Sequence, residues 1–253
     1  MLKAILYDKD GTLMRFDEFW VPVARNAIKQ IIKKAISVAD SGLCANGDFY
    51  EKVSPLLFKI ERKIGIYGNV SLPDGILCRG TYASFAEAIT NELKEFGVGF
   101  VVSERDVREA IAENMGFGKI LPTSENLRES LLKAKKHAAL YVVTTDDPSI
   151  TKICLDKLNV SDLFDGIFCD DGIIPYKPDP YSANLIINEH KAEKGEVYMI
   201  GDTITDEAFA KNAGINFVYV GNDERFSKRV VFKADSAGCA TDLILKIESA
   251  KRD

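Results

Sequence analysis

The sequence predicts an α/β fold, with a parallel sheet core covered by helices and a smaller helical insertion. Two observations support this prediction. In the second half of the chain, short apolar runs that end in polar or Gly residues alternate with amphipathic stretches, as in parallel sheets. Between residues 16 and 117 this alternation gives way to a series of helical patterns. A chain of 253 residues can form one large domain or two smaller ones.

The predicted strands are short, apolar and rich in β-branched residues. Such runs are typical of strands buried on both faces of a sheet. The last of the five segments is the weakest. The segments are Ala4 to Tyr7, Ala139 to Val143, Val197 to Ile200, Phe217 to Val220 and Gly166 to Cys169.

Four amphipathic stretches around these strands predict the core helices. They cover residues 124–138, 147–160, 179–190 and 205–214. In the first of them, Ser124 is a plausible N-cap, and Leu127, Leu131 and Leu132 are expected on one buried face. Gly214 is expected to end the last of them.

The insertion predicts a second, smaller domain that is mostly helical. Its first helix has apolar residues at helical spacing from Trp20 to Ala35 and is expected to stop near Gly42. Three more helices are expected over residues 48–65, 82–97 and 103–116, the first of them kinked or split at Pro55. The predicted domains are therefore residues 1–15 with 118–253, and residues 16–117.

Composition narrows the class of function. The net charge of −5 argues against a nucleic-acid partner as the main role. The five cysteines are scattered and form no Cys-x-x-Cys pair, which fits free thiols in a reducing compartment. The apolar start before Asp8 is too short for a signal peptide, and no run suits a membrane span. We expect a cytoplasmic protein that binds neither nucleic acid nor membrane, as a monomer or homodimer.

Polar residues follow the predicted strands at the points where those strands end. The carboxyl ends of parallel strands meet at one edge of a sheet, where ligands bind. Buried like charges repel, and Mg²⁺, which prefers oxygen ligands, would offset carboxylates gathered there. The residues expected at this edge are Asp8, Asp10, Thr144 or its neighbour Thr145, the exposed-looking Lys177, Asp202 and Asp206.

As a set, these segments resemble the four motifs of the haloacid dehalogenase superfamily, in order. The motifs are "DKDGTL", a threonine after a second strand, "KP" and "GDTITD". The resemblance covers residues 1–15 and about 118–215, and it implies a Rossmann-like core. It also implies that residues 16–117 form the helical cap that some members carry between the first and second motifs.

The resemblance implies a role for each residue of the first motif. Asp8 matches the nucleophile, which forms an aspartyl-phosphate, and it is also expected to contact the metal. Asp10 matches the general acid and base, and its backbone carbonyl is expected to bind Mg²⁺. Gly11 lets the chain turn tightly beside the phosphate. Dehalogenases of the superfamily lack an acid at the position of Asp10, so its presence here favours phosphoryl transfer.

The later motifs are expected to hold the phosphate and the metal. Thr144, favoured over Thr145, matches the hydroxyl that binds a phosphoryl oxygen, and Lys177 matches the cation beside nucleophile and phosphate. Asp202 matches a direct metal ligand, and Asp206 a second ligand or an outer-shell acid. The expected activity is Mg²⁺-dependent hydrolysis of small phosphomonoesters such as phosphoglycolate or sugar phosphates.

Two alternatives to a phosphatase stay open. A phosphomutase of the same superfamily uses the same aspartyl-phosphate, and the site motifs do not separate the two. A signalling module that stores phosphate on an aspartate also combines Asp, Thr and Lys around Mg²⁺, but such domains are about half this length. The long insertion and Asp10 favour turnover.

Other polar residues receive simpler interpretations. Four acids near the predicted site are interpreted as caps and surface-loop residues: Asp146, Asp147, Asp170 and Asp171. In the insertion, Arg79 and Thr81 could reach a leaving group, but ordinary surface roles are at least as plausible, and neither is assigned to the site.

Overall fold

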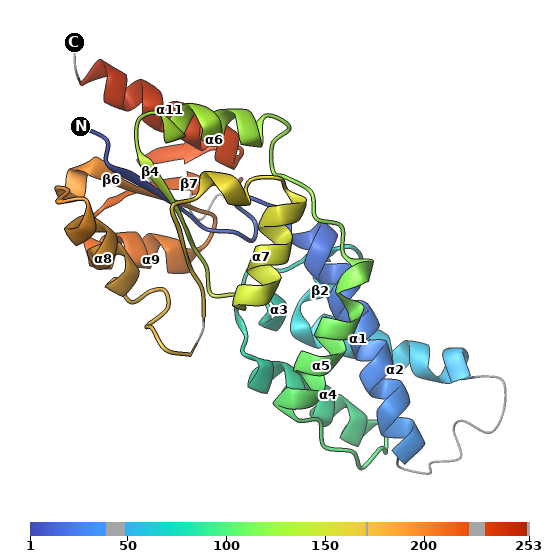
Figure 1. Cartoon of the computed structure of the whole chain (residues 1–253). Helices are drawn as coiled ribbons and strands as arrows, with labels where there is room; N and C mark the ends of the chain where they lie inside the picture. The colour runs from blue at the N-terminus through green and yellow to red at the C-terminus, as the bar shows by residue number, and fades with distance from the viewer. Residues whose placement is uncertain (39–48, 171, 223–230, 252–253) are drawn as a thin grey trace. The chain divides into compact units, whose positions relative to one another are not determined.

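The computed structural model describes residues 1–38, 49–170, 172–222 and 231–251 (Figure 1). The chain divides into two compact units, Met1–Arg15 with Ile120–Asp253, and Phe16–Lys119. The predicted domain limits lie after residues 15 and 117, and the observed divisions lie after residues 15 and 119. The role of the second unit as a cap stays a prediction.

The first unit is built on a six-stranded sheet with the order β5-β4-β1-β6-β7-β8, in which every neighbouring pair is parallel. The prediction of a parallel α/β core is therefore confirmed. The sequence did not predict the sixth strand, β8. The strands are β1 (Ala4–Tyr7), β4 (Ala139–Val143), β5 (Gly166–Phe168), β6 (Val197–Gly201), β7 (Asn216–Val220) and β8 (Phe232–Ala234).

The strand β1 lies at the centre of this sheet. Its residue Tyr7 pairs with Val142 of β4 on one side and with Ile200 of β6 on the other. Because all three strands are parallel and in this register, the residues that follow them emerge at one edge of the sheet. This edge carries the motif residues.

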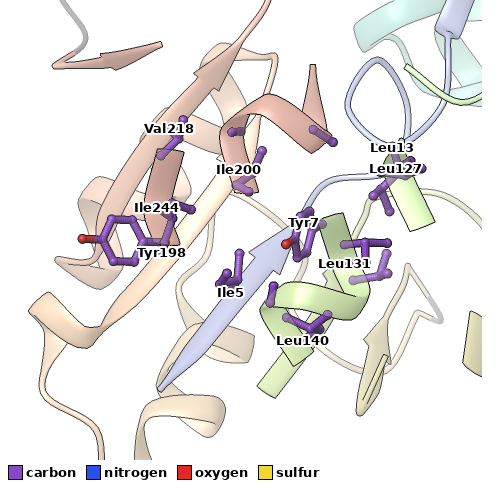
Figure 2. Close-up of a cluster of buried hydrophobic side chains, with 14 of the residues drawn as sticks. Ile5, Tyr7, Leu13, Leu127, Leu131, Leu140, Tyr198, Ile200, Val218 and Ile244 are labelled. Carbon is purple, nitrogen blue, oxygen red and sulfur yellow. The ribbon is translucent and has the colours of Figure 1, made fainter. Parts of the chain in front are cut away.

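Both faces of the sheet are buried, as the continuous apolar runs predict. Successive strand residues point to opposite faces, so β1 contributes Ile5 and Tyr7 to one cluster and Ala4 and Leu6 to the other. Figure 2 shows the first cluster, where side chains from the sheet pack against Leu131 and its neighbours.

Helices cover both faces of the sheet. Figure 1 shows α6 and α11 on one side and α8 and α9 on the other. The pattern did not predict α11. The helices of this unit are α6 (Leu127–Lys135), α7 (Pro148–Lys157), α8 (Tyr181–Glu189), α9 (Ile204–Ala213) and α11 (Ala237–Ala250), with 3-10 turns at Ser161–Leu163 and Lys194–Glu196.

Helix ends follow the predicted signals in part. Gly214 ends α9 in the left-handed conformation with a φ of 73°, as predicted. The N-cap of α6 is Asn126, however, and not Ser124. Leu132 is also not part of the buried face of α6, because 43% of its surface is exposed, whereas Leu131 is fully buried.

The second unit is mostly helical, as expected, but it also contains a two-stranded antiparallel sheet that the sequence did not predict. Pro55 does not split its helix, and Gly42 lies outside the described residues. The elements are α1 (Phe16–Val38), α2 (Phe49–Ile64), β2 (Ile66–Tyr67), β3 (Val70–Ser71), α3 (Ile76–Arg79), α4 (Tyr82–Glu95), α5 (Glu104–Asn114) and a 3-10 turn at Met115–Phe117.

Ion pairs and hydrogen bonds hold the small sheet of this unit against its first helix. The Asp17 carboxylate accepts hydrogen bonds from the backbone N–H of Ser71 at 3.0 Å and from its hydroxyl at 2.5 Å. Arg25 of α1 pairs with Glu61 of α2 at 2.6 Å and donates to the carbonyl of Gly68 in the turn between the strands. These contacts fix a turn that hydrophobic periodicity alone does not reveal.

The sequence predicts free cysteine thiols and no membrane-spanning segment. Four of the five cysteines lie in the described residues and all are free thiols, while Cys44 lies outside. Among the helices of this part of the chain, none combines the length and the apolar character needed to cross a membrane.

The two adjacent leucines of α6 provide a matched test of the core. Leu131→Ala is expected to lower the free energy of unfolding by about 2–5 kcal/mol, because it removes a fully buried side chain and leaves a cavity. Leu132→Ala should change it by about 1 kcal/mol or less, because that side chain is partly in water. Denaturant unfolding of both variants measures the difference, and equal losses would contradict this account of the core.

Candidate active site

Asp8 begins the site because it directly follows the central strand. Its backbone N–H donates to the carbonyl of Ile200 at 2.9 Å, which extends the pairing of β1 with β6 by one residue. Its side chain is buried, with 6% of the residue exposed. The strand thus holds a carboxylate in the interior, where an unpaired charge would be costly.

Lys177 supplies a countercharge to Asp8. Its ammonium lies 2.5 Å from Oδ1 of Asp8 and 2.6 Å from Oδ1 of Asp206. The side chain is buried, so the exposed appearance that the sequence suggests for Lys177 is wrong. Burial alone would lower the pKa of Lys177, but the two carboxylates outweigh it and raise that pKa, so the lysine is charged at neutral pH.

Asp206 is held by the first turn of α9. Thr203 is the N-cap of this helix, and its hydroxyl accepts from the backbone N–H of Asp206, three residues later, at 3.3 Å. In return, Oδ2 of Asp206 accepts from the backbone N–H of Thr203 at 3.0 Å and from its hydroxyl at 2.6 Å. This capping box directs Oδ1 toward Lys177. Both carboxylate oxygens are thus engaged, which favours the outer-shell alternative for Asp206.

Asp202 approaches the first motif closely. The hydroxyl of Thr12 donates to its Oδ1 at 3.1 Å, a contact between residues 190 positions apart in the chain. Gly11 has a φ of 82°, and a Cβ atom built there would lie 2.1 Å from Oδ2 of Asp202. Glycine is therefore required at this position both by the backbone conformation and by the space that Asp202 occupies.

Three carboxylates, from Asp8, Asp202 and Asp206, form one acidic cluster. Each offers an oxygen, and these atoms all lie within 4.8 Å of one another. Desolvation and the neighbouring acids outweigh Lys177 and raise the pKa of Asp8 to about 7, and the same causes raise the pKa of Asp202 well above its usual value. One ammonium is thus not enough for three carboxylates.

This cluster fits a divalent cation. Oxygen donors at this separation, an excess of negative charge and raised carboxylate pKa values are what a hard cation such as Mg²⁺ would relieve. Asp8 and Asp202 would hold it directly, with Asp206 behind them. The backbone carbonyl of Asp10, which the family resemblance also assigns to the metal, follows Asp8 by two residues.

The carboxylate of Asp10 is paired separately. Its Oδ2 lies 2.6 Å from the ammonium of Lys9, which also lies 2.9 Å from Oδ2 of Asp146. The interpretation of Asp146 as a surface-loop residue is therefore wrong, because its side chain is 10% exposed and paired. Asp147, in contrast, is the N-cap of α7, as interpreted, and Asp171 lies outside the described residues.

Thr144 directly follows β4 at the same edge of the sheet. Its backbone N–H donates to the carbonyl of Phe168 in β5 at 2.9 Å, and its side chain is buried. The adjacent Thr145 is exposed, so burial favours Thr144 as the inward-facing hydroxyl. Its contact with a phosphoryl oxygen stays a prediction.

In the second unit, Thr81 is the N-cap of α4 and forms a capping box with Ser84. Arg79 pairs with Asp74 at 2.8 Å at the surface of the same unit. Both contacts are structural, in line with the surface roles that the sequence left open.

Sequence reasoning missed two residues of the site, Lys9 and Thr12. Thr12 belongs to the quoted motif, and its small hydroxyl next to Gly11 was a usable signal. Lys9 has no local signal, because a lysine beside two acids usually marks a solvated segment.

The comparisons place the chain in a family. A family model described as haloacid dehalogenase-like hydrolase matches residues 2–214, so the chain belongs to this family of hydrolases. The resemblance predicted from the motifs is thereby confirmed at the level of the family.

Similar proteins agree with this family at low identity. A phosphoglycolate phosphatase from Vibrio cholerae serotype O1 is 23% identical over 126 residues, which cover 47% of this chain and 56% of that protein. The chain spans about half the length of the curated relatives it matches.

Solved structures cover almost the whole chain. The HAD-hydrolase YfnB from Bacillus subtilis, bound to magnesium, matches with a TM-score of 0.62 at 14% identity over 97% of this chain and 98% of that one. A predicted phosphoglycolate phosphatase from Haemophilus somnus 129pt matches with a TM-score of 0.60 at 16% identity over 98% of each chain. At such identities the likeness concerns the fold.

Gly11→Ala tests the close approach of the first motif to Asp202. The left-handed backbone alone should cost about 1 kcal/mol of stability, and the new methyl group should displace the Asp202 carboxylate. We expect a lower melting temperature and a weaker response to Mg²⁺. Gly195→Ala is the matched control, since a Cβ there meets nothing within 4 Å. A Gly11→Ala variant with the wild-type Mg²⁺ response would contradict this reading of the site.

Mg²⁺ should stabilise the folded protein, and more so at pH 8 than at pH 5. The pKa of Asp8 is raised to about 7 in the folded state. Without metal, the charged Asp8 carboxylate therefore destabilises the fold: this effect is absent below about pH 4, grows as the pH rises and is complete above about pH 7. Bound Mg²⁺ relieves that cost, so it should bind more tightly at the higher pH; at a hundredfold excess over its dissociation constant its total stabilisation is about 2.7 kcal/mol. Melting curves at both pH values with and without Mg²⁺ measure the increment.

Variants identify the cluster as the source of that stabilisation. Asp202→Asn should abolish most of the increment, whereas Asp235→Asn, which changes an exposed acid of the same unit, should keep it. An equal increment in both variants would contradict metal binding at the cluster.

Proposed function

We propose that this protein is a Mg²⁺-dependent phosphatase of small phosphomonoesters that works through an aspartyl-phosphate on Asp8. The observation that carries the proposal is the ammonium of Lys177 between Asp8 and Asp206, in an acidic cluster with Asp202. Such a cluster suits a phosphoryl group, which needs cations around it and a carboxylate in line with it.

In the first step, an oxygen of Asp8 attacks phosphorus, and the bond from phosphorus to the ester oxygen breaks. Asp10 gives its proton to that leaving oxygen. Lys177 stays protonated and offsets negative charge on the nucleophile and on the transferring group. The hydroxyl of Thr144 holds a phosphoryl oxygen.

In the second step, Asp10 accepts a proton from a water molecule, which attacks phosphorus. The bond between phosphorus and Asp8 breaks, and inorganic phosphate leaves. Bound Mg²⁺ would supply charge neutralisation for the phosphoryl oxygens. Asp202, fixed by Thr12, and Asp8 would hold the cation.

The relatives and the residue types support the proposed substrate class. The similarity to phosphoglycolate phosphatases of Vibrio species supports a small anionic phosphomonoester. Asp10 distinguishes this site from the dehalogenases of the family, which lack that acid. We propose that the helical unit from about residue 16 to 117 covers the substrate and selects it, and that the enzyme acts in the cytoplasm.

Asp8→Asn is the decisive test. The amide is nearly isosteric but cannot form an aspartyl-phosphate, so phosphate release should fall by about 10³-fold or more while the fold persists. The melting temperature without metal should be equal or higher, because one buried like charge is gone. Asp162→Asn, which changes an exposed acid of the same unit, is the control.

Continuous phosphate release from phosphoglycolate and a panel of sugar phosphates separates the rivals. A phosphomutase would convert one sugar phosphate into its isomer with little release, and a signalling module would stop after one turnover. Release by Asp8→Asn close to that of the wild type would contradict the proposed mechanism.

A further inference from the structure

Lys9 is a fully buried lysine that belongs neither to the acidic cluster nor to the proposed reaction steps. Its ammonium lies 2.6 Å from Oδ2 of Asp10 and 2.9 Å from Oδ2 of Asp146, and its side chain has no exposed surface. A buried ammonium is tolerated only when it is paired. Burial would lower the pKa of Lys9, but Asp10 and Asp146 outweigh burial and raise it, so the lysine carries its charge.

The Lys9 ammonium thus forms a bridge between Asp10 and Asp146. Hydrogen bonds with neighbouring residues fix the Asp146 end of this bridge. Oδ1 of Asp146 accepts from the N–H of Asp147 at 2.8 Å, its carbonyl accepts from the N–H of Asp170 at 3.1 Å, and its own N–H donates to the hydroxyl of Thr144 at 3.3 Å. The acid thus sits in an ordered turn between β4 and α7. Through Lys9, this turn becomes an anchor for the first motif.

The pair with Lys9 gives the Asp10 carboxylate a countercharge other than Lys177, which serves the cluster of Asp8, Asp202 and Asp206. Asp10 lies two residues from Asp8. The acids of the cluster would therefore repel its carboxylate, and the cation proposed there would attract it. Without that countercharge, the attraction of the cation for Asp10 as a further ligand would be unopposed by Lys9. A carboxylate bound in this way would lose the orientation that proton transfer to a leaving oxygen needs.

We propose that Lys9 is a positioning residue that holds the Asp10 carboxylate for proton transfer by tying it to Asp146. This inference rests on the proposed phosphatase function and deepens it. Lys9 does not touch the reacting atoms; it acts through the orientation of Asp10. The effect of its loss should therefore depend on how much the leaving group needs a proton.

The test compares Lys9→Met, Asp10→Asn and the double variant. Methionine keeps an unbranched stem and removes the charge. With saturating Mg²⁺, kcat/KM is measured for an alkyl phosphate and for nitrophenyl phosphate, whose leaving group needs no proton. We expect Lys9→Met to lower kcat/KM by about 10–10²-fold for the alkyl phosphate and much less for nitrophenyl phosphate. In the Asp10→Asn background, Lys9→Met should cause no further loss.

A merely structural role for Lys9 predicts a different pattern. Equal losses on both substrates, or a full additional loss in the Asp10→Asn background, would overturn the proposal. Lys152→Met is the matched control, because Lys152 pairs with Asp156 at 2.8 Å on the exposed surface of α7. Its activity should equal that of the wild type.

A second variant keeps the test decisive if Lys9→Met does not fold. Asp146→Asn preserves the Lys9–Asp10 pair and the shape of the turn, and weakens only the anchor. It should show the same dependence on the leaving group, at smaller size, and a uniform loss would overturn the proposal. Wild-type protein that hydrolyses no phosphomonoester would overturn the proposed function itself, whereas an active wild type with an unselective Lys9→Met variant would overturn only the positioning role.

Discussion

The concentration of carboxylates at one sheet edge is the constraint on which the rest of this site depends. Asp8, Asp202 and Asp206 bring oxygens within 4.8 Å of one another, and burial together with mutual repulsion raises the pKa of Asp8 to about 7. The fold supplies Lys177 between two of these acids and the hydroxyl of Thr12 on the third. The remaining negative charge is what makes the cluster a suitable site for a divalent cation.

The all-parallel sheet explains why residues so distant in sequence converge. β1 lies between β4 and β6, so the segments that follow three adjacent strands leave the sheet at the same edge. Helix α9 begins just beyond β6, and Asp206 in its first turn makes two contacts. It accepts from Thr203 in the capping box, and it pairs with Lys177. The Asp206 side chain therefore belongs both to the N-terminal cap of α9 and to the acidic cluster.

The sequence predicted what local patterns encode. Strands, most core helices and the acids of the motifs follow from periodicity and punctuation within short windows. Burial of single polar residues does not, because it depends on distant partners: Lys177 looked exposed, yet it pairs with acids 169 and 29 positions away. The same reason explains the errors for Asp146 and Leu132. The short strands β2, β3 and β8 carried too few residues to show a period.

Two lysines divide the acids of this site into two groups. Lys177 joins the nucleophile candidate to the acid of α9, and Lys9 joins Asp10 to the turn after β4. Asp8 and Asp10 are two residues apart, and the charge of Asp10 contributes to the raised pKa of Asp8, so each carboxylate needs a nearby countercharge. Opposite charges about 4 Å apart attract by about 4 kcal/mol at an effective dielectric of about 20, which is enough to hold Asp8 beside Lys177 and Asp10 beside Lys9. In the proposed mechanism, the pairing thus lets adjacent acids take different tasks, Asp8 beside the metal and Asp10 in proton transfer.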